Sequence, residues 1–169
     1  MSKAQTSPTT HSDDWEKDRR HVLHPFQHFA SFNDEGSLVM TRGDGCYIVD
    51  ENGKRYFDAV GGMWCTNIGL GREEMADAIA DQVRQLAYGN PFVDMTNVPA
   101  AQLAARLSEL APGDLNHVTF TNSGSTANDI AYRIIRMYQN ARGKPDKRHL
   151  LSRVDAYHGG TFLAASLGG

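Results

Sequence analysis

The sequence predicts an α/β fold in which a small antiparallel hairpin precedes the start of a parallel sheet with helices on it. Residues 47–50 and 55–58 are strand-like and are joined across Asn52-Gly53, a dipeptide that supplies the positive φ angles of a tight hairpin turn. Further along, strand-like residues 117–121 and 149–153 flank a long periodic helix. This spacing is typical of a strand–helix–strand unit with a right-handed crossover.

The composition is that of an ordinary globular protein and argues against nucleic-acid-binding, membrane, disulfide-rich and zinc-binding proteins. Of the 169 residues, 40% are hydrophobic and 22% are charged, and a net charge of -3 gives no reason to expect nucleic acid or a membrane as partner. Cys46 and Cys65 form no CxxC motif, so neither a disulfide framework nor a zinc site is indicated. No apolar run reaches membrane-spanning length and the N-terminus lacks the apolar core of a signal peptide, so a cytoplasmic location is expected.

The N-terminal part is expected to comprise a disordered tail over residues 1–12 and a first segment over residues 13–71. Ser12 is the predicted N-cap of a short helix that carries Trp15 and ends before Pro25. Phe26 and the phenylalanines that follow it are expected to anchor an irregular arm, or in part to line a pocket. The histidines nearby have no carboxylate or thiolate to complete a ligand set, and no metal site is predicted.

A glycine-rich stretch over residues 59–71 follows the hairpin. It carries four glycines around Trp64, and Gly69-Leu70-Gly71 is not a dinucleotide fingerprint because it follows no clear strand and lacks the third glycine. Trp64 is expected either to pack in the core or to wall a pocket. Amphipathic helices are predicted over residues 72–86 and 97–110.

The turn Asn122-Ser-Gly-Ser125 is the first candidate for a binding site. It lies between the strand-like residues 117–121 and a helix that is predicted to open at Thr126. The first N–H groups of a helix lack partners and the helix dipole favours negative charge, so this turn suits a phosphate. It lacks the lysine and the glycine spacing of a nucleotide-binding P-loop, and on this evidence alone an ordinary capped helix is an equal alternative.

A second loop, Tyr157-His158-Gly159, narrows the choice of ligand. Both loops follow predicted parallel strands, whose carboxyl ends meet at one edge of a sheet. An aromatic ring beside a phosphate cradle suits a phosphate that carries a flat heteroaromatic head. Pyridoxal 5'-phosphate fits this description and is an electron sink for chemistry at amino-bearing carbons.

Taken together and in order, the motifs resemble the class III (omega-type) aminotransferases of the fold-type I pyridoxal phosphate enzymes. The resemblance covers nearly the whole chain after the tail and is nearest to the omega-amino acid or amine:pyruvate branch. Its motifs are His24-Pro25-Phe26, Gly62-Met-Trp-Cys65, Asn67-Ile-Gly-Leu-Gly71, Asn122-Ser-Gly-Ser-Thr-Ala-Asn128 and Asp155-Ala-Tyr-His-Gly-Gly160.

The resemblance implies roles for the cofactor-binding residues. Gly124 and Ser125 are expected to hold the cofactor phosphate through main-chain N–H groups and the serine hydroxyl. Tyr157 is expected to stack on the pyridine ring, while His158 and Gly159 shape that loop.

The resemblance also implies a substrate pocket and a departure from the family pattern. Phe26 and Trp64 are expected to wall the pocket, with Phe92 reaching it from the partner subunit of a homodimer. The family commonly has Glu where Thr126 stands, a change that a hydroxyl in the first helical turn can accommodate.

The catalytic residues of the family are expected downstream of this chain. The family forms a Schiff base through a lysine and protonates the pyridine nitrogen through an aspartate, whereas the lysines here lie in a tail, on a helix face or in polar turns. Residues 72–169 therefore read as the first part of a larger cofactor-binding domain, and the chain alone is expected to be inactive.

The expected function is amino-group transfer from an omega-amino acid or amine to a keto acid such as pyruvate. The amino donor stays open among taurine, β-alanine, diamines and aryl amines. A decarboxylase or racemase of the same fold is an alternative. Another is a non-catalytic fragment that associates with a second chain carrying the remaining sequence.

Overall fold

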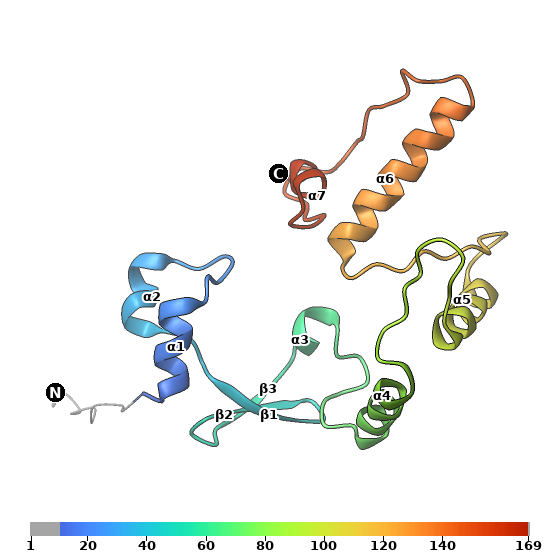
Figure 1. Cartoon of the computed structure of the whole chain (residues 1–169). Helices are drawn as coiled ribbons and strands as arrows, with labels where there is room; N and C mark the ends of the chain where they lie inside the picture. Colours follow the sequence, from blue (N-terminus) through green and yellow to red (C-terminus); the bar gives the residue numbers. More distant parts are fainter. Residues whose placement is uncertain (1–10, 169) are drawn as a thin grey trace, which may run out of the picture. The chain divides into compact units, whose positions relative to one another are not determined.

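The computed structural model describes residues 11–168 and divides the chain into two compact units, residues 1–88 and 89–169 (Figure 1). Most of the expected tail lies outside the described residues, and the predicted boundary at residue 71 stays a prediction. The first unit contains α1 (Asp13–His21), α2 (Phe29–Glu35), β1 (Met40–Asp44), β2 (Tyr47–Asp50), β3 (Arg55–Phe57), α3 (Gly61–Trp64) and α4 (Glu73–Leu86). The second contains α5 (Val98–Leu110), α6 (Gly124–Ala141) and α7 (Phe162–Ser166). None of the helices within the described residues is long and apolar enough to cross a membrane.

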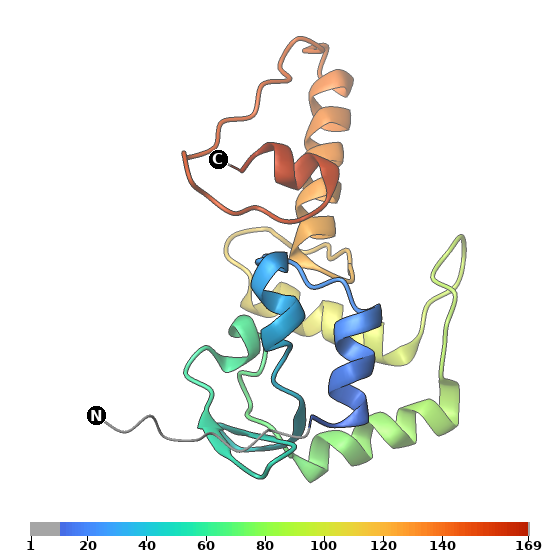
Figure 2. The ribbon, with the colours of Figure 1, turned by 90° about the vertical axis from the view of Figure 1, so that its left-hand side faces the viewer.

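A small core joins α1 and α2. Ser12 caps α1 as predicted, because its hydroxyl accepts a hydrogen bond from the Trp15 N–H at 3.1 Å. Trp15 and Phe32 are each only 5% exposed, and the His24 ring lies 5.0 Å from the Phe32 ring. The expectation of an irregular arm was wrong for residues 29–35, which form α2 beside α1 (Figures 1 and 2).

The predicted hairpin is confirmed and belongs to a three-stranded antiparallel sheet in the order β1-β2-β3. The turn between β2 and β3 is organised by Asp50, which is 5% exposed. Its carboxylate accepts hydrogen bonds from the N–H groups of Asn52 and Lys54, each at 2.9 Å, and from the Tyr56 hydroxyl at 2.8 Å. Burial opposes the ionised form, but these hydrogen bonds outweigh it and hold the pKa of Asp50 below its ordinary value of 3.8.

The glycine-rich loop 58–71 is tied to the sheet at both ends. At its start the Asp58 N–H donates to the Cys46 carbonyl at 2.9 Å. At its end Gly45 and Leu70 exchange two backbone hydrogen bonds, of 2.9 and 2.8 Å. The loop therefore leaves the sheet and returns to it, and it contains α3 and Trp64.

In the second unit α6 is the long element, and α7 lies beside it (Figures 1 and 2). α6 begins at Gly124 rather than at Thr126 as predicted, because Ser123 is the N-cap and accepts from the Thr126 N–H at 3.2 Å. The predicted strands 117–121 and 149–153 are not formed as paired strands in the described part of the chain. Their β-branched and apolar residues suit a strand, but a strand also needs a neighbouring strand to bond with.

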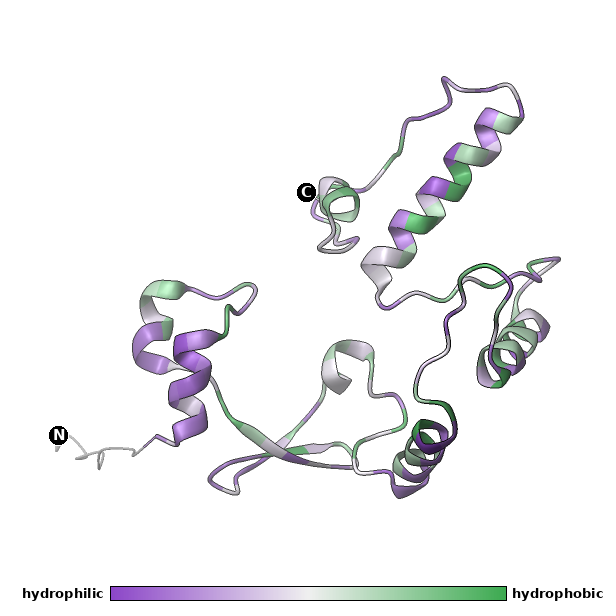
Figure 3. Ribbon diagram, in the orientation of Figure 1, coloured by the Kyte–Doolittle hydropathy of each residue, from purple (hydrophilic) through white to green (hydrophobic). Residues whose placement is uncertain are grey.

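Apolar faces remain exposed on the helices of both units. Green hydrophobic turns alternate with purple polar ones along α4 and α6 (Figure 3). On α4, Ile79 and Val83 are 56% and 55% exposed, and on α6 Ile134 is 54% exposed. These side chains have the spacing of a helix face that packs on a core, but no other part of the described chain buries them.

Candidate functional site: the start of α6 and the loop 155–160

The N-terminus of α6 has the features of an anion site. Ser123 satisfies two N–H groups, since its hydroxyl accepts from Thr126 and its carbonyl accepts from Ala127. The N–H groups of Gly124 and Ser125 make no hydrogen bond within the described chain. The first turn of α6 contains no acidic residue, whereas α4 begins with Glu73 and Glu74. The dipole of α6 is therefore not offset by a carboxylate of its own first turn.

Thr126 is held rather than free. Its hydroxyl donates to the Asn122 side-chain oxygen at 2.9 Å and lies 3.1 Å from the Ser123 hydroxyl. These contacts fix the turn that leads into α6. A methyl group placed on Gly124 would meet nothing within 4 Å, so the space beside the first helical residue is open.

The loop 155–160 is seated on this helix start. The Gly160 N–H donates to the Ser125 hydroxyl at 3.0 Å. Gly159 is buried with φ +138°, and a Cβ at this position would stand 2.4 Å from Ser125 Oγ and 2.7 Å from Ser125 Cα. Only glycine permits so close an approach of the two backbones. The Ser125 hydroxyl accepts from Gly160 and keeps its own O–H to donate to an anion.

Two further polar side chains of α6 hold this loop and α7. The Asn128 amide donates to the His158 carbonyl at 2.6 Å, and the Thr161 hydroxyl donates to the Asp129 carboxylate at 3.0 Å. Ser125, Asn128 and Asp129 stand at i, i+3 and i+4, which places them on one face of the helix. Asn128 and Asp129 had no predicted role in holding this loop, although the spacing of polar residues beside the apolar stripe of the helix was an available signal.

The predicted aromatic residue of this loop is accessible. Tyr157 is 74% exposed, so its ring is open to a stacking ligand. The Nε2 atom of His158 is shielded from solvent and makes no hydrogen bond within the described residues. A cavity of about 490 Å³ is lined by Leu151, Ser152, Arg153, Ala156, Tyr157 and His158. The structure thus brings Gly124, Ser125, His158 and Gly159 together and places Tyr157 next to them in the chain.

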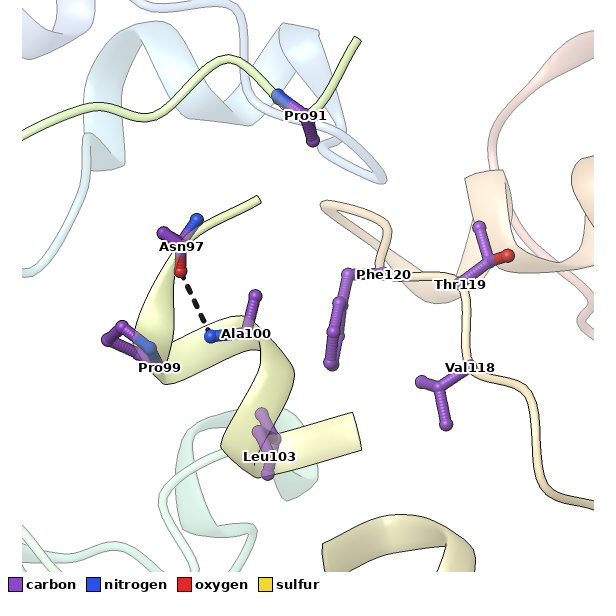
Figure 4. Close-up of a pocket in the computed structure, with 8 residues that line it drawn as sticks. All are labelled: Pro91, Asn97, Pro99, Ala100, Leu103, Val118, Thr119 and Phe120. Carbon is purple, nitrogen blue, oxygen red and sulfur yellow. Dashed lines mark hydrogen bonds between the residues drawn. The ribbon is translucent and has the colours of Figure 1, made fainter. Parts of the chain in front are cut away.

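A second, more apolar groove of about 660 Å³ lies between α5 and residues 118–120 (Figure 4). Figure 4 shows Phe120 and Val118 on one side and Leu103 of α5 on the other, with the Asn97 cap of α5 bonded to the Ala100 N–H. Although larger than the cavity beside Tyr157, it contains none of the predicted site residues. It offers apolar surface and no group for chemistry, so the start of α6 is the better candidate.

The remaining predicted site residues are exposed aromatics. Phe26 and Trp64 belong to the first unit and are 94% and 78% exposed, and Phe92 belongs to the second and is 76% exposed. Phe26 and Trp64 have positive φ angles, 58° and 66°, as does Val93 beside Phe92, at 67°. Such angles are uncommon for residues other than glycine and often occur at functional sites. Whether these aromatics share one pocket with the cradle stays a prediction.

A cluster of Ser37, His24 and Asp18 is not a catalytic triad. The same ring nitrogen of His24, Nε2, lies 2.9 Å from Asp18 Oδ2 and 3.2 Å from the Ser37 hydroxyl. A triad requires the carboxylate and the hydroxyl on opposite nitrogens of the ring. The Ser37 hydroxyl, together with His24, lowers the pKa of Asp18, so the cluster acts as a polar link between α1 and the start of the sheet segment.

Comparisons with known proteins identify the family of the chain. A model of the family Aminotransferase class-III matches residues 29–169. The putrescine–pyruvate aminotransferase of Pseudomonas aeruginosa is 40% identical over 151 residues, which are 89% of this chain and 33% of that protein. The omega-transaminase of Pseudomonas jessenii in complex with PMP superposes with a TM-score of 0.90 at 37% identity, over 94% of this chain and 35% of that one.

A third relative is an engineered omega-transaminase. It is a thermostable variant made for asymmetric synthesis of enantiopure bulky amines, with a TM-score of 0.88 at 36% identity over 92% of this chain and 34% of that one. In it a tryptophan, a phenylalanine and an arginine are replaced, the first two standing 28 positions apart.

The chain therefore belongs to the class III aminotransferase family, and its fold is that of the fold-type I enzymes. Pyridoxal 5'-phosphate is the cofactor of this family, and the expectation of this cofactor is confirmed. The chain spans about a third of the length of the relatives that it matches.

Proposed function

We propose that this chain supplies the phosphate cradle, the ring-stacking loop and part of the substrate pocket of a pyridoxal-phosphate-dependent transaminase. The reaction is transfer of an amino group from an omega-amino acid or amine to a keto acid such as pyruvate. The observation that carries the proposal is the seating of the loop 155–160 on the first residue pair of α6. In support of the proposal, the N–H groups of Gly124 and Ser125 make no hydrogen bond within the described residues, the Ser125 hydroxyl contacts this loop, and the loop carries the exposed Tyr157.

In this proposal the main-chain N–H groups of Gly124 and Ser125 and the Ser125 hydroxyl bind the phosphate dianion at the helix N-terminus. Tyr157 presents its ring to the pyridine face, and the Asn128 contact to the His158 carbonyl keeps that loop in place. When bound, the cofactor supplies an electron sink for bonds to the amino-bearing carbon. The protein residues described here bind and orient it.

The aromatic residues support an amine-binding wall. Trp64 and Phe92 are 28 positions apart, the same separation as the tryptophan and the phenylalanine replaced in the omega-transaminase variant engineered for bulky amines. We propose that these two residues, with Phe26, limit the size of the amine. Large apolar side chains make such a wall selective for the uncharged part of the donor.

A titration of the labelled 169-residue chain tests the cradle directly. Inorganic phosphate and pyridoxal 5'-phosphate should both shift the amide resonances of Gly124 and Ser125, and pyridoxal without phosphate should not. Only the phosphorylated cofactor should also shift the ring resonances of Tyr157. Ser125→Ala should weaken the response, whereas Ser108→Ala, on α5, should not. Equal responses to pyridoxal and to its phosphate would contradict the cradle.

A reduction experiment tests the proposal that the chain alone is inactive. Lys54, Lys144 and Lys147 lie in exposed turns, and Lys17 is paired with Asp13 at 2.6 Å, which raises its pKa above the ordinary 10.5. None of these exposed side chains lies in an apolar setting that would activate an amine by desolvation, so no single lysine is expected to bond the cofactor. Borohydride reduction of the chain with the cofactor should leave no stoichiometric adduct at one lysine. A specific adduct would refute this part of the proposal.

Product analysis on the holoenzyme that contains this chain distinguishes the reactions open to the fold. Pyruvate consumption matched by alanine formation is the expected result. Release of carbon dioxide from the donor would instead identify a decarboxylase, and loss of optical activity without amino-group transfer would identify a racemase.

The exposed apolar faces of α4 and α6 favour association with further polypeptide, whether of this chain or another. Intact mass spectrometry of the purified enzyme would detect a second chain.

A further inference from the structure

Four consecutive residues of the loop 58–71 have left-handed backbone angles. Gly61, Gly62, Met63 and Trp64 have φ of 58°, 58°, 62° and 66°. The hydrogen bonds of the segment follow the i to i+4 pattern, with the Trp64 N–H donating to the Val60 carbonyl at 2.9 Å and the Cys65 N–H to the Gly61 carbonyl at 3.0 Å. Residues 61–64 therefore form one turn of left-handed helix.

Such a turn is disfavoured for side-chain-bearing residues, because the Cβ atom crowds the following carbonyl oxygen. The first two positions are glycines and carry no such penalty. Met63 and Trp64 do carry it, and they are the residues that the turn presents to solvent, 69% and 78% exposed. A strained conformation at an exposed tryptophan persists only if surrounding contacts fix it.

Asp58 makes the contacts that fix the beginning of this turn. Its carboxylate Oδ2 accepts from the Gly62 N–H at 2.8 Å, and its carbonyl accepts from the Gly61 N–H at 3.2 Å. Its own N–H donates to the Cys46 carbonyl at 2.9 Å, next to β2. Asp58 thus links the left-handed turn to the three-stranded sheet.

We propose that Asp58 is a positioning residue: it holds the left-handed turn 61–64 and thereby sets the direction of the Trp64 side chain in the amine-binding wall. This inference rests on the proposed function for the role of Trp64. Asp58 itself does not contact the substrate. Its effect passes through the hydrogen bond to the Gly62 N–H, so an acceptor oxygen is required at this position and a negative charge is not.

Two replacements separate the acceptor from the charge. Asp58→Asn keeps an oxygen at the same place, and Asp58→Leu removes it with a side chain of similar reach. The first measurement is the amide-to-α-proton NOE within Met63 and within Trp64, in the labelled 169-residue chain. This NOE is strong at positive φ because the two protons are close together. It should persist in Asp58→Asn and weaken in Asp58→Leu, and its persistence in both variants would overturn the positioning role.

The second measurement links the turn to substrate binding, in the holoenzyme that contains this chain. Asp58→Leu should raise the KM for the amine by at least about tenfold with a smaller change in kcat, as expected when a pocket residue is displaced. Asp58→Asn should restore the KM, and Asp58→Leu combined with Trp64→Ala should be no worse than Trp64→Ala alone. General misfolding would lower kcat through loss of active enzyme and would not be rescued by asparagine.

The outcomes distinguish this proposal from the function on which it rests. If Trp64→Ala raises the KM and Asp58→Leu does not, the positioning role is refuted and the role of Trp64 stands. If Trp64→Ala leaves the KM unchanged while the NOE still depends on Asp58, the substrate role of Trp64 is refuted. In that case Asp58 fixes the turn without directing substrate binding.

Discussion

Replacing Gly159 by alanine tests how closely the loop 155–160 must approach the start of α6. A methyl group on Gly159 would lie 2.4 Å from Ser125 Oγ and 2.7 Å from Ser125 Cα, well inside the optimal carbon–carbon separation of roughly 3.5–4.0 Å. The Cα atom belongs to the backbone of α6 and cannot move aside as a side chain could. The loop must therefore lift away from the helix.

The free-energy cost of keeping the loop on the helix in Gly159→Ala has two contributions. Backbone strain for a non-glycine residue at φ +138° costs about 1–3 kcal/mol, and the steric overlap costs about 1–3 kcal/mol more. A total of roughly 2–6 kcal/mol corresponds to at least about a 25-fold change in the equilibrium between the seated and the lifted loop.

Hydrogen exchange at the Gly160 amide is the assay, because this N–H donates to the Ser125 hydroxyl in the seated loop. In Gly159→Ala the Gly160 amide should exchange at least about 25-fold faster, or as fast as an open chain, and affinity for pyridoxal 5'-phosphate should fall. Gly160→Ala is the matched control, since a Cβ there meets nothing within 4 Å. Unchanged exchange and affinity in Gly159→Ala would refute the close approach.

Three other predictions concern stability. Met63→Gly should raise the free energy of unfolding in urea by up to about 1 kcal/mol, because glycine relieves the left-handed strain at φ 62°. A lower free energy of unfolding would contradict strain at this position. Asn97→Ala should destabilise α5 by about 1 kcal/mol, because the cap on the Ala100 N–H is lost. Asn97→Ser should keep most of the stability, because serine is also a good N-cap. Helix content followed on heating measures both effects. The lowered pKa of Asp50 means that its stabilising contribution is present above the ordinary value of 3.8 and is lost as pH falls through the lower, folded value. The midpoint temperature of thermal unfolding should therefore fall in this acid range, and Asp50→Asn should remove that part of the pH dependence.

Local sequence signals were sufficient for several elements. Ser12 and Asn97 stand where helices begin, and Asn52-Gly53 stands where the chain reverses, because caps and tight turns depend on a few neighbouring residues. The motif around Ser125 was also sufficient to predict an anion site, and its occurrence in order with the motifs from His24-Pro25-Phe26 to Asp155–Gly160 identified the family. These features are encoded within short stretches whose hydrogen bonds are nearly all local.

Other features required the tertiary structure, because they depend on contacts between distant residues. α2 forms where Phe32 can be buried beside the His24 ring, and no local signal distinguished it from an irregular arm. Residues 117–121 and 149–153 have strand-like sequences but remain unpaired in the described chain, since a strand is defined by the neighbour that it bonds with. Two glycines before Met63 made a left-handed turn possible, and only the structure showed that the Asp58 N–H ties this turn to the Cys46 carbonyl beside the sheet. The sequence by itself determined which chemistry the site could hold, and the tertiary structure decided how Gly159, Asn128 and Asp58 hold its parts in place, because steric fit and long-range hydrogen bonds have no local signature.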